Sequence, residues 1–387
     1  METELKSLAA QVLESCLAGS PPDALPRELV DDPGGSALFG VLAEGLGDRF
    51  EPALCDAYAR LFAAAVAPGD AARLVERYQR VRRPRLIAGE PRRVFVLSRV
   101  TLGADVAITS VLLDAAKRRF PESEIVFAGP RKNYELFAGD PRIGFLGANY
   151  RRGSLAERLK VCDELRAVLD LADSVVLDPD SRLTQLGLVP VCDEGRYHFF
   201  ESRGYGGDSA RTLPELAAAW ARETMDIEGA RPYLALAEAP VQHGRIAISL
   251  GVGENPAKRI ADPFEEELLQ LLGSRGPLWI DKGAGGEEAA RVERAAGKAG
   301  VAAKFWDGSF AGFASIIAGS ALYVGYDSAG QHVAAASGVP LISIFAGFPA
   351  PRMFERWRPS GPGCRVIRVD RADPKEVLEQ VRELLLG

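Results

Sequence analysis

The sequence is poor in several residue types, and each shortage excludes a class of protein. It has five cysteines and three histidines among 387 residues, without CxxC or HExxH spacing. This pattern argues against a disulfide-stabilised secreted domain or a zinc enzyme, so we expect no metal site. No apolar run approaches the ~20 residues of a membrane-spanning helix, so we expect peripheral membrane contact at most.

The sequence also lacks an excess of positive charge, because its 47 lysines and arginines are outnumbered by 53 acidic residues. The net charge is −6 and the pI is about 5.4, which argues against binding nucleic acid through bulk charge. The first ten residues contain acids and no basic stretch of the kind that opens a signal peptide, which predicts a cytoplasmic protein. With 47% hydrophobic residues, the chain can build large cores, and its length favours roughly two to three domains.

Residues 1–88 are rich in alanine and leucine, and their apolar residues recur at helical spacing. Leu5, Leu8 and Val12 form one stripe, and Leu54 and Tyr58 begin another. We therefore expect an all-helical N-terminal module without catalytic motifs, which offers a docking surface for a protein partner. An arginine-rich linker follows.

From residue 91 the pattern changes to alternating strands and helices, which is typical of α/β folds with parallel sheets. We expect one Rossmann-like domain over residues 91–238 and another over 242–387, joined by a linker that contains Pro232 and Pro240. A tight loop is expected over Thr101–Asp105, before a helix that starts at Val106. A loop-rich stretch is expected over His198–Asp208.

The segment Ala321–Phe345 predicts a strand, a tight turn, a short helix and a second strand. Asp327 lies on the turn and His332 follows it by five residues. Backbone N–H groups at such a helix start attract anions, so the turn is a candidate phosphate site.

This segment resembles glycosyltransferase family 9, the heptosyltransferase-like enzymes, in which D-S-G-x-x-H-x-A-A-A is usual. The chain has Asp327-Ser-Ala-Gly-Gln-His-Val-Ala-Ala-Ala336, with Ala329 in place of the first glycine. A second resemblance, to L-G-D-x-x-x-T, covers Leu102–Thr109, where Ala104 is inserted before the acid. The family's F-G-P-T is replaced by Phe345-Ala-Gly-Phe-Pro349.

The resemblance covers about residues 93–386 and implies a GT-B architecture, in which two Rossmann-like domains face a cleft. It implies an inverting, metal-independent transferase with a nucleotide-diphosphate sugar as co-substrate and no other cofactor. The family's best-known donor is ADP-heptose, with a glycan or glycolipid acceptor in lipopolysaccharide biosynthesis.

By resemblance, Asp105 is the catalytic base that faces the cleft and takes the proton of the acceptor hydroxyl. The alternative is that Asp105 only caps the following helix. Lys258 is expected to meet the donor diphosphate, where a cation offsets charge on the leaving group. The alternative is that Lys258 is an exposed lysine at the start of a helix.

The remaining candidate residues complete the two substrate sites. The donor site is expected to comprise Gly253, Lys258, Glu287, Glu288, Asp327, Ser328, Ala329, Gly330 and His332. One of the two glutamates would hold the ribose, although acids at a helix start are also ordinary dipole partners. His332 either bonds a phosphate or packs against the sheet. The acceptor site is expected to include Thr109, Arg131 and Tyr205, although arginines here also fit a solvated helix face.

The sequence therefore predicts a glycosyltransferase that moves a heptose-like sugar from a nucleotide donor to a hydroxyl group. Two alternatives stay open. A nucleotide-sugar epimerase would share the donor cleft but need no acceptor. A non-catalytic relative would serve as an assembly partner through its N-terminal helices.

Overall fold

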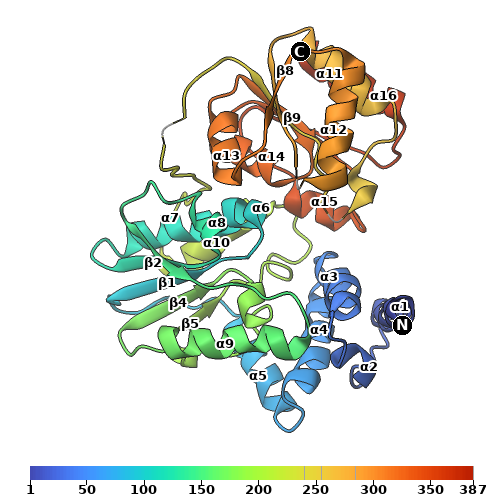
Figure 1. The fold of residues 1–387 in the computed structure, drawn as a ribbon. Helices are drawn as coiled ribbons and strands as arrows, with labels where there is room; N and C mark the ends of the chain where they lie inside the picture. The colour runs from blue at the N-terminus through green and yellow to red at the C-terminus, as the bar shows by residue number, and fades with distance from the viewer. Residues whose placement is uncertain (239, 254, 284, 387) are drawn as a thin grey trace. The chain divides into compact units, whose positions relative to one another are not determined.

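The computed structural model describes residues 1–238, 240–253, 255–283 and 285–386 (Figure 1). The chain divides into two compact units. The first unit comprises residues 1–101, 108–134 and 141–231. The second comprises residues 102–107, 135–140 and 232–387, so that two short segments between elements of the first unit are grouped with the second.

A five-stranded parallel sheet lies in the first unit, with strand order β3-β2-β1-β4-β5. Its strands are β1 (Arg93–Leu97), β2 (Glu124–Gly129), β3 (Ile143–Gly147), β4 (Ser174–Asp178) and β5 (Tyr197–Phe199). The first of these, β1, pairs with β2 on one side and with β4 on the other. The sequence predicted four of these strands but missed β5, which is too short for its alternation to be recognised.

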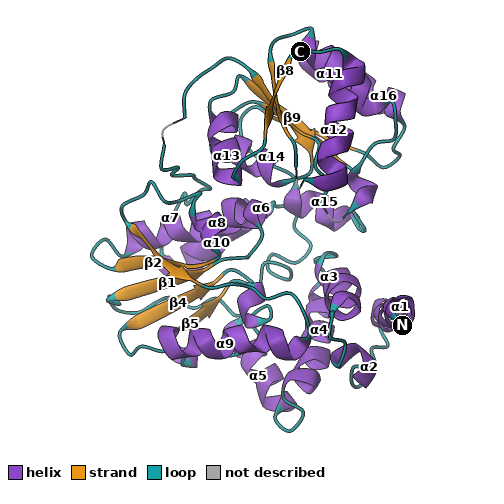
Figure 2. Cartoon of the chain, in the orientation of Figure 1, coloured by secondary structure: helices purple, strands orange, loops and turns teal. Residues whose placement is uncertain are grey.

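Helices pack against both faces of this sheet (Figure 2). They are α7 (Ser110–Arg119), α8 (Arg131–Tyr134), α9 (Leu155–Leu169) and α10 (Leu213–Met225), with 3₁₀ turns at η3 (Arg182–Thr184) and η4 (Glu194–Arg196). The first turn of α9 is fixed by a capping box, in which Ser154 and Glu157 bond each other's backbone N–H groups.

The prediction of a tight loop over Thr101–Asp105 is wrong. Residues Leu102–Ala104 form a helical turn, α6, and Asp105–Thr109 continue it as a π-helical turn, η2, before α7 begins. Because π-type hydrogen bonds reach one residue further along the chain than α-type bonds, such a turn takes up one extra residue. The insertion of Ala104 is thus accommodated within a continuous helix.

The N-terminal helices belong to the first unit and share its hydrophobic core. They are α1 (Glu2–Leu17), α2 (Arg27–Val30), η1 (Ser36–Ala43), α3 (Glu44–Gly47), α4 (Pro52–Val66) and α5 (Ala71–Val81). One buried cluster contains Tyr58 of α4 and Tyr78 of α5 together with Phe95 of β1 and Phe199 of β5. These helices therefore form a continuous structure with the first sheet.

The second unit contains a six-stranded parallel sheet with order β11-β10-β9-β6-β7-β8. Its strands are β6 (Ile246–Ser249), β7 (Leu278–Asp281), β8 (Ala303–Trp306), β9 (Leu322–Tyr326), β10 (Leu341–Phe345) and β11 (Cys364–Arg368). Counted from β6, this is the doubly wound order 3-2-1-4-5-6, which reverses direction between β6 and β9. Ligands bind such sheets beyond the carboxyl ends of the strands at this reversal.

The helices of the second unit are η5 (Pro256–Lys258), α11 (Phe264–Gly273), α12 (Gly286–Ala299), α13 (Phe310–Ala318), α14 (Ala329–Ala336), α15 (Pro351–Trp357) and α16 (Pro374–Leu386). The prediction of two parallel α/β sheets preceded by helices is confirmed. It missed β8, a sheet-edge strand whose four side chains are all at least partly exposed, so no buried run marks it. Within the described residues, no helix is long and apolar enough to cross a bilayer.

Candidate functional site

The turn after β9 carries Asp327, whose side chain is 6% exposed. The Lys258 Nζ atom donates to Oδ2 of Asp327 at 2.7 Å and to its main-chain oxygen at 3.2 Å. Lys258 lies in the connection after β6 and Asp327 directly after β9. The ion pair therefore joins the two strands between which the sheet order reverses, where a ligand site is expected.

Hydrogen bonds of Asn255 and close packing of Gly347 stabilise the turn that carries Lys258. Asn255 accepts from the Ala257 N–H at 3.0 Å and donates to the Gly347 carbonyl at 3.2 Å. Gly347 has φ +69°, and a Cβ atom there would lie 2.8 Å from the main-chain nitrogen of Lys258. The segment Phe345–Pro349 therefore supports the lysine through backbone contact.

The helix α14 begins where the sequence predicted an anion-binding turn. Ser328 is its N-cap residue, and Ala329 and Gly330 are its first two residues. Gly330 is buried over Tyr323, whose Oη lies 3.4 Å from Oγ of Ser328. A Cβ atom on Gly330 would lie 2.7 Å from Cζ of Tyr323, so the close approach of α14 to β9 depends on this glycine.

We expect Gly330→Ala to lower the free energy of unfolding by about 1–3 kcal/mol, because the added methyl group overpacks the contact with Tyr323. Denaturant unfolding of the full chain measures the effect. Gly297→Ala is the matched control: Gly297 lies inside α12, where an added Cβ atom would meet no packing neighbour within 4 Å, and its variant should be neutral or stabilising by up to about 1 kcal/mol. Equal stability of the Gly330 variant and the native chain would contradict the packing argument.

His332 is 6% exposed on α14, and its ring meets Trp357 edge-on at 5.7 Å between ring centres. Burial lowers the pKa of His332 to about 4, and nearby Lys258 acts in the same direction, against the opposing charge of Asp327. The imidazole is therefore neutral near pH 7. It packs against a neighbour, and it can act toward a phosphate only as a neutral hydrogen-bond donor.

The two glutamates at the start of α12 differ in their surroundings. Glu287 is exposed. Glu288 accepts from the Val252 N–H at 2.9 Å and thereby holds the loop that follows β6. Gly253, in that loop, is exposed with φ +57°. The structure brings Glu288, Gly253 and Lys258 to the same connection, while Glu287 faces solvent.

Asp105 is fully buried as the first residue of η2, although a base facing a cleft was expected. It lies in the segment 102–107 that is grouped with the second unit, which also contains Asp327. Thr109, at the end of η2, is also fully buried. Of the other predicted acceptor residues, Arg131 is exposed with its guanidinium 4.5 Å from the Phe145 ring centre, and Tyr205 donates to Glu223 at 2.7 Å.

Sequence reasoning missed a buried ionic cluster beyond the carboxyl ends of β1, β4 and β5. Asp180 accepts from Arg99 at 3.2 Å and from the Ser202 hydroxyl at 2.8 Å, and it pairs with Arg203 at 2.6 Å. All four side chains are at most about one-tenth exposed. The only available signal was the run Asp178-Pro-Asp180 at the end of a predicted strand.

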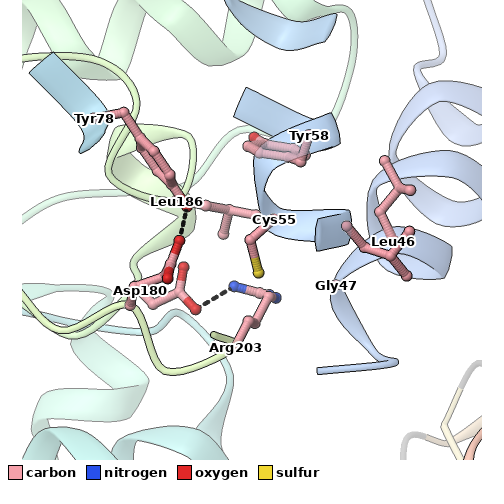
Figure 3. Close-up of a pocket in the computed structure, with 10 residues that line it drawn as sticks. Leu46, Gly47, Cys55, Tyr58, Tyr78, Asp180, Leu186 and Arg203 are labelled. Atoms are coloured by element: carbon pink, nitrogen blue, oxygen red, sulfur yellow. Dashed lines mark hydrogen bonds and ion pairs between the residues drawn. The ribbon is translucent and has the colours of Figure 1, made fainter. Parts of the chain in front are cut away.

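The N-terminal helices close over this cluster (Figure 3). Glu201 accepts from the Tyr78 hydroxyl of α5 and pairs with Arg82 at 2.8 Å. A small cavity lies between the N-terminal helices and the cluster, and Cys55 of α4, Asp180 and Arg203 are among the residues that line it. Its volume of about 10 Å³ suits one water molecule. The residues that follow β4 and β5 are therefore packed against the N-terminal helices.

Glu201 makes the stability of the first unit depend on pH. Burial raises its pKa from 4.5 to about 7, against the opposing charge of Arg82. The folded state therefore binds a proton more tightly than the unfolded state, so this contribution is complete below pH 4.5 and is lost as pH rises to about 7. Between pH 4.5 and 8, the native protein should lose free energy of unfolding as Glu201 loses its proton. We expect Glu201→Gln to remove on the order of 3 kcal/mol of that loss.

Denaturant unfolding at a series of pH values measures this slope. Glu164→Gln is the matched control, because Glu164 is 59% exposed in its pair with Arg151 and should leave the slope unchanged. An identical slope for the Glu201 variant and the native chain would contradict the assignment.

Among the described residues, no group of three or more histidine, cysteine or acidic side chains is arranged to hold a metal ion. One family model matches part of the chain. The model of glycosyltransferase family 9 (heptosyltransferase) matches residues 201–384, which include Lys258 and the Asp327–Ala336 motif. No curated protein sequence matches the chain.

Solved structures show the same fold at low sequence identity. E. coli heptosyltransferase WaaC with ADP is 18% identical with a TM-score of 0.55, covering 76% of this chain and 99% of its own. A family 9 glycosyl transferase from Veillonella parvula is 16% identical with a TM-score of 0.55, covering 77% and 91%. E. coli ADP-heptose lps heptosyltransferase II is 20% identical with a TM-score of 0.52, covering 76% and 98%.

Proposed function

We propose that this protein is an inverting, metal-independent glycosyltransferase of the cytoplasm, because the model of glycosyltransferase family 9 matches residues 201–384. It takes a nucleotide-diphosphate sugar as donor and a glycan or glycolipid hydroxyl as acceptor. The observation that carries the proposal is the Lys258–Asp327 pair beside the start of α14. There, a cation and helix N–H groups converge at the reversal point of the second sheet.

In the proposed reaction, the acceptor oxygen forms a bond to the anomeric carbon while the bond from that carbon to the diphosphate breaks. Asp105 takes the acceptor's proton. Lys258 turns from Asp327 toward the diphosphate, and the N–H groups of Ala329 and Gly330 stabilise the charge that develops on it. The nucleoside diphosphate leaves with the electron pair of the broken bond.

ADP-heptose is the proposed donor, and a lipopolysaccharide core glycan is the proposed acceptor. The support is that two structures of the same fold are described as heptosyltransferases, one with ADP and one named for ADP-heptose and lps. Arg131 is exposed and suits contact with an anionic acceptor group.

The burial of Asp105 adds one step to this proposal. A carboxylate with no exposed surface can take a proton from a substrate only after its surroundings open, so acceptor binding must shift the Asp105–Thr109 turn. The same burial favours a second candidate function, a family relative that binds nucleotide sugars without transferring them.

Titration calorimetry with ADP, GDP, UDP, CDP and dTDP, followed by donor hydrolysis with and without EDTA, tests the proposal. We expect ADP to bind most tightly and slow ADP-heptose hydrolysis to persist in EDTA. Tight nucleotide binding without any turnover would favour the non-catalytic relative. Release of an altered free sugar would indicate an epimerase, and no binding of any nucleotide would refute a donor site.

A further inference from the structure

Gln331 lies between Asp327 and His332 and is completely buried. Its Nε2 atom is 2.5 Å from Oδ1 of Asp327 and 3.3 Å from Nε2 of His332. Its Oε1 atom accepts from the Ser343 hydroxyl of β10 at 2.5 Å. A single amide therefore connects the acid and the histidine of the candidate donor site to the central sheet.

These contacts determine the orientation of the amide. A carboxylate only accepts hydrogen bonds, so the NH₂ group of Gln331, and not its oxygen, must face Asp327. The second proton of the NH₂ group then points away from the carboxylate, where two acceptors lie within reach: Nε2 of His332 at 3.3 Å and the main-chain oxygen of Trp357 at 3.5 Å. The contact with His332 is the shorter of the two, and two donors cannot face each other, so this geometry favours an Nε2 atom of His332 that carries no proton.

We propose that Gln331 is a positioning residue that fixes His332 as the neutral, Nδ1-protonated imidazole and anchors Asp327 opposite Lys258. The role toward the donor diphosphate rests on the proposed function. The assignment of the tautomer does not, because it follows from contacts within the protein.

The surroundings of His332 support this arrangement. Burial, which lowers its pKa to about 4, keeps the ring neutral, and the edge-on contact with Trp357 fixes the plane of the ring. Among the side chains of the proposed site, Lys258 is then the cation and His332 is a neutral N–H donor. This division of roles lets the histidine orient a diphosphate oxygen without adding a second buried charge.

Nuclear magnetic resonance of the full chain tests the tautomer directly. The protein has only three histidines, so His332→Asn suffices to assign the ring signals of His332 in two-bond ¹H–¹⁵N spectra. We expect native His332 to be a single Nδ1–H tautomer at pH 7. The Nε2–H tautomer, or a mixture of both, in the native protein would overturn the proposal without any need for a Gln331 variant.

Gln331→Met keeps the side-chain length but removes the donor. We expect His332 to become a mixture of tautomers and the affinity for inorganic pyrophosphate, measured by calorimetry, to fall at least about tenfold. Gln242→Leu is the matched control, because Gln242 is an exposed glutamine of the same unit, and it should change neither readout. A Met variant that keeps the Nδ1–H tautomer would overturn the proposal.

The two proposals fail in different ways. If native His332 has the expected tautomer but no pyrophosphate or nucleotide binds, the proposed function and the role toward a diphosphate are refuted, while the internal assignment stands. If nucleotides bind and His332 has the other tautomer, the donor site stands and the role of Gln331 is refuted.

Discussion

Asp105→Asn is expected to slow sugar transfer by about two to four orders of magnitude, the usual contribution of a positioned general base. Asparagine has the shape of aspartate but cannot take a proton, so it preserves the packing of this fully buried position. Nucleotide affinity should stay within about twofold of the native value, because the proposed base contacts the acceptor and not the diphosphate. Steady-state rates with ADP-heptose and calorimetry with ADP measure the two effects.

Asp114→Asn is the matched control, because Asp114 lies on the following helix, α7, in a surface pair with Arg118, and its variant should keep native rates. If Asp105→Asn also keeps native rates, Asp105 is not the base. Its burial would then reflect a structural role inside the continuous helix that begins at Leu102.

Lys258→Met should lower the affinity for nucleoside diphosphates by about a hundredfold, because it removes the cation proposed to meet the diphosphate. It should also destabilise the free protein by about 3 kcal/mol, since Asp327 would remain buried without its partner. Calorimetry and denaturant unfolding measure the two losses separately.

A double variant separates binding from stability. Lys258→Met combined with Asp327→Asn removes both charges, so it should recover most of the lost stability without recovering affinity. Lys298→Met is the control, because Lys298 is largely exposed in its pair with Glu266, and it should be near native in both measurements. Nucleotide binding that survives in the single Lys258 variant would exclude Lys258 from the diphosphate site.

Most of the fold and the turn after β9 could be predicted because their causes are local. Apolar runs such as Val94–Leu97 and Leu341–Phe345 form buried parallel strands because both faces of such a sheet are covered. The small residues after Asp327 allow α14 to start close to β9, so the motif alone located the turn. The sequence-based prediction missed the short strand β5 and the edge strand β8, because neither has a buried run of sufficient length.

The candidate site was predictable only in part. The sequence indicated Lys258 and Asp327 separately, and the crossover between β6 and β9 brings their side chains into contact. It gave no sign of Gln331, because a glutamine on a helix is usually solvated and becomes significant here only through burial next to Asp327 and His332. Nor did it reveal the burial of Asp105, which depends on the π-helical turn and the elements packed around it.

The sequence by itself therefore determined most strands of the two parallel sheets, the family resemblance and the position of the turn between β9 and α14, since these depend on neighbouring residues along one strand or helix. Only the tertiary structure decided which charges are paired and which side chains are buried, including Asp180 and Glu201 beneath the N-terminal helices. Those properties depend on contacts between residues far apart in the chain, 23 positions for Asp180 and Arg203 and 119 for Glu201 and Arg82, and the energy of a charge is set by what surrounds it in space.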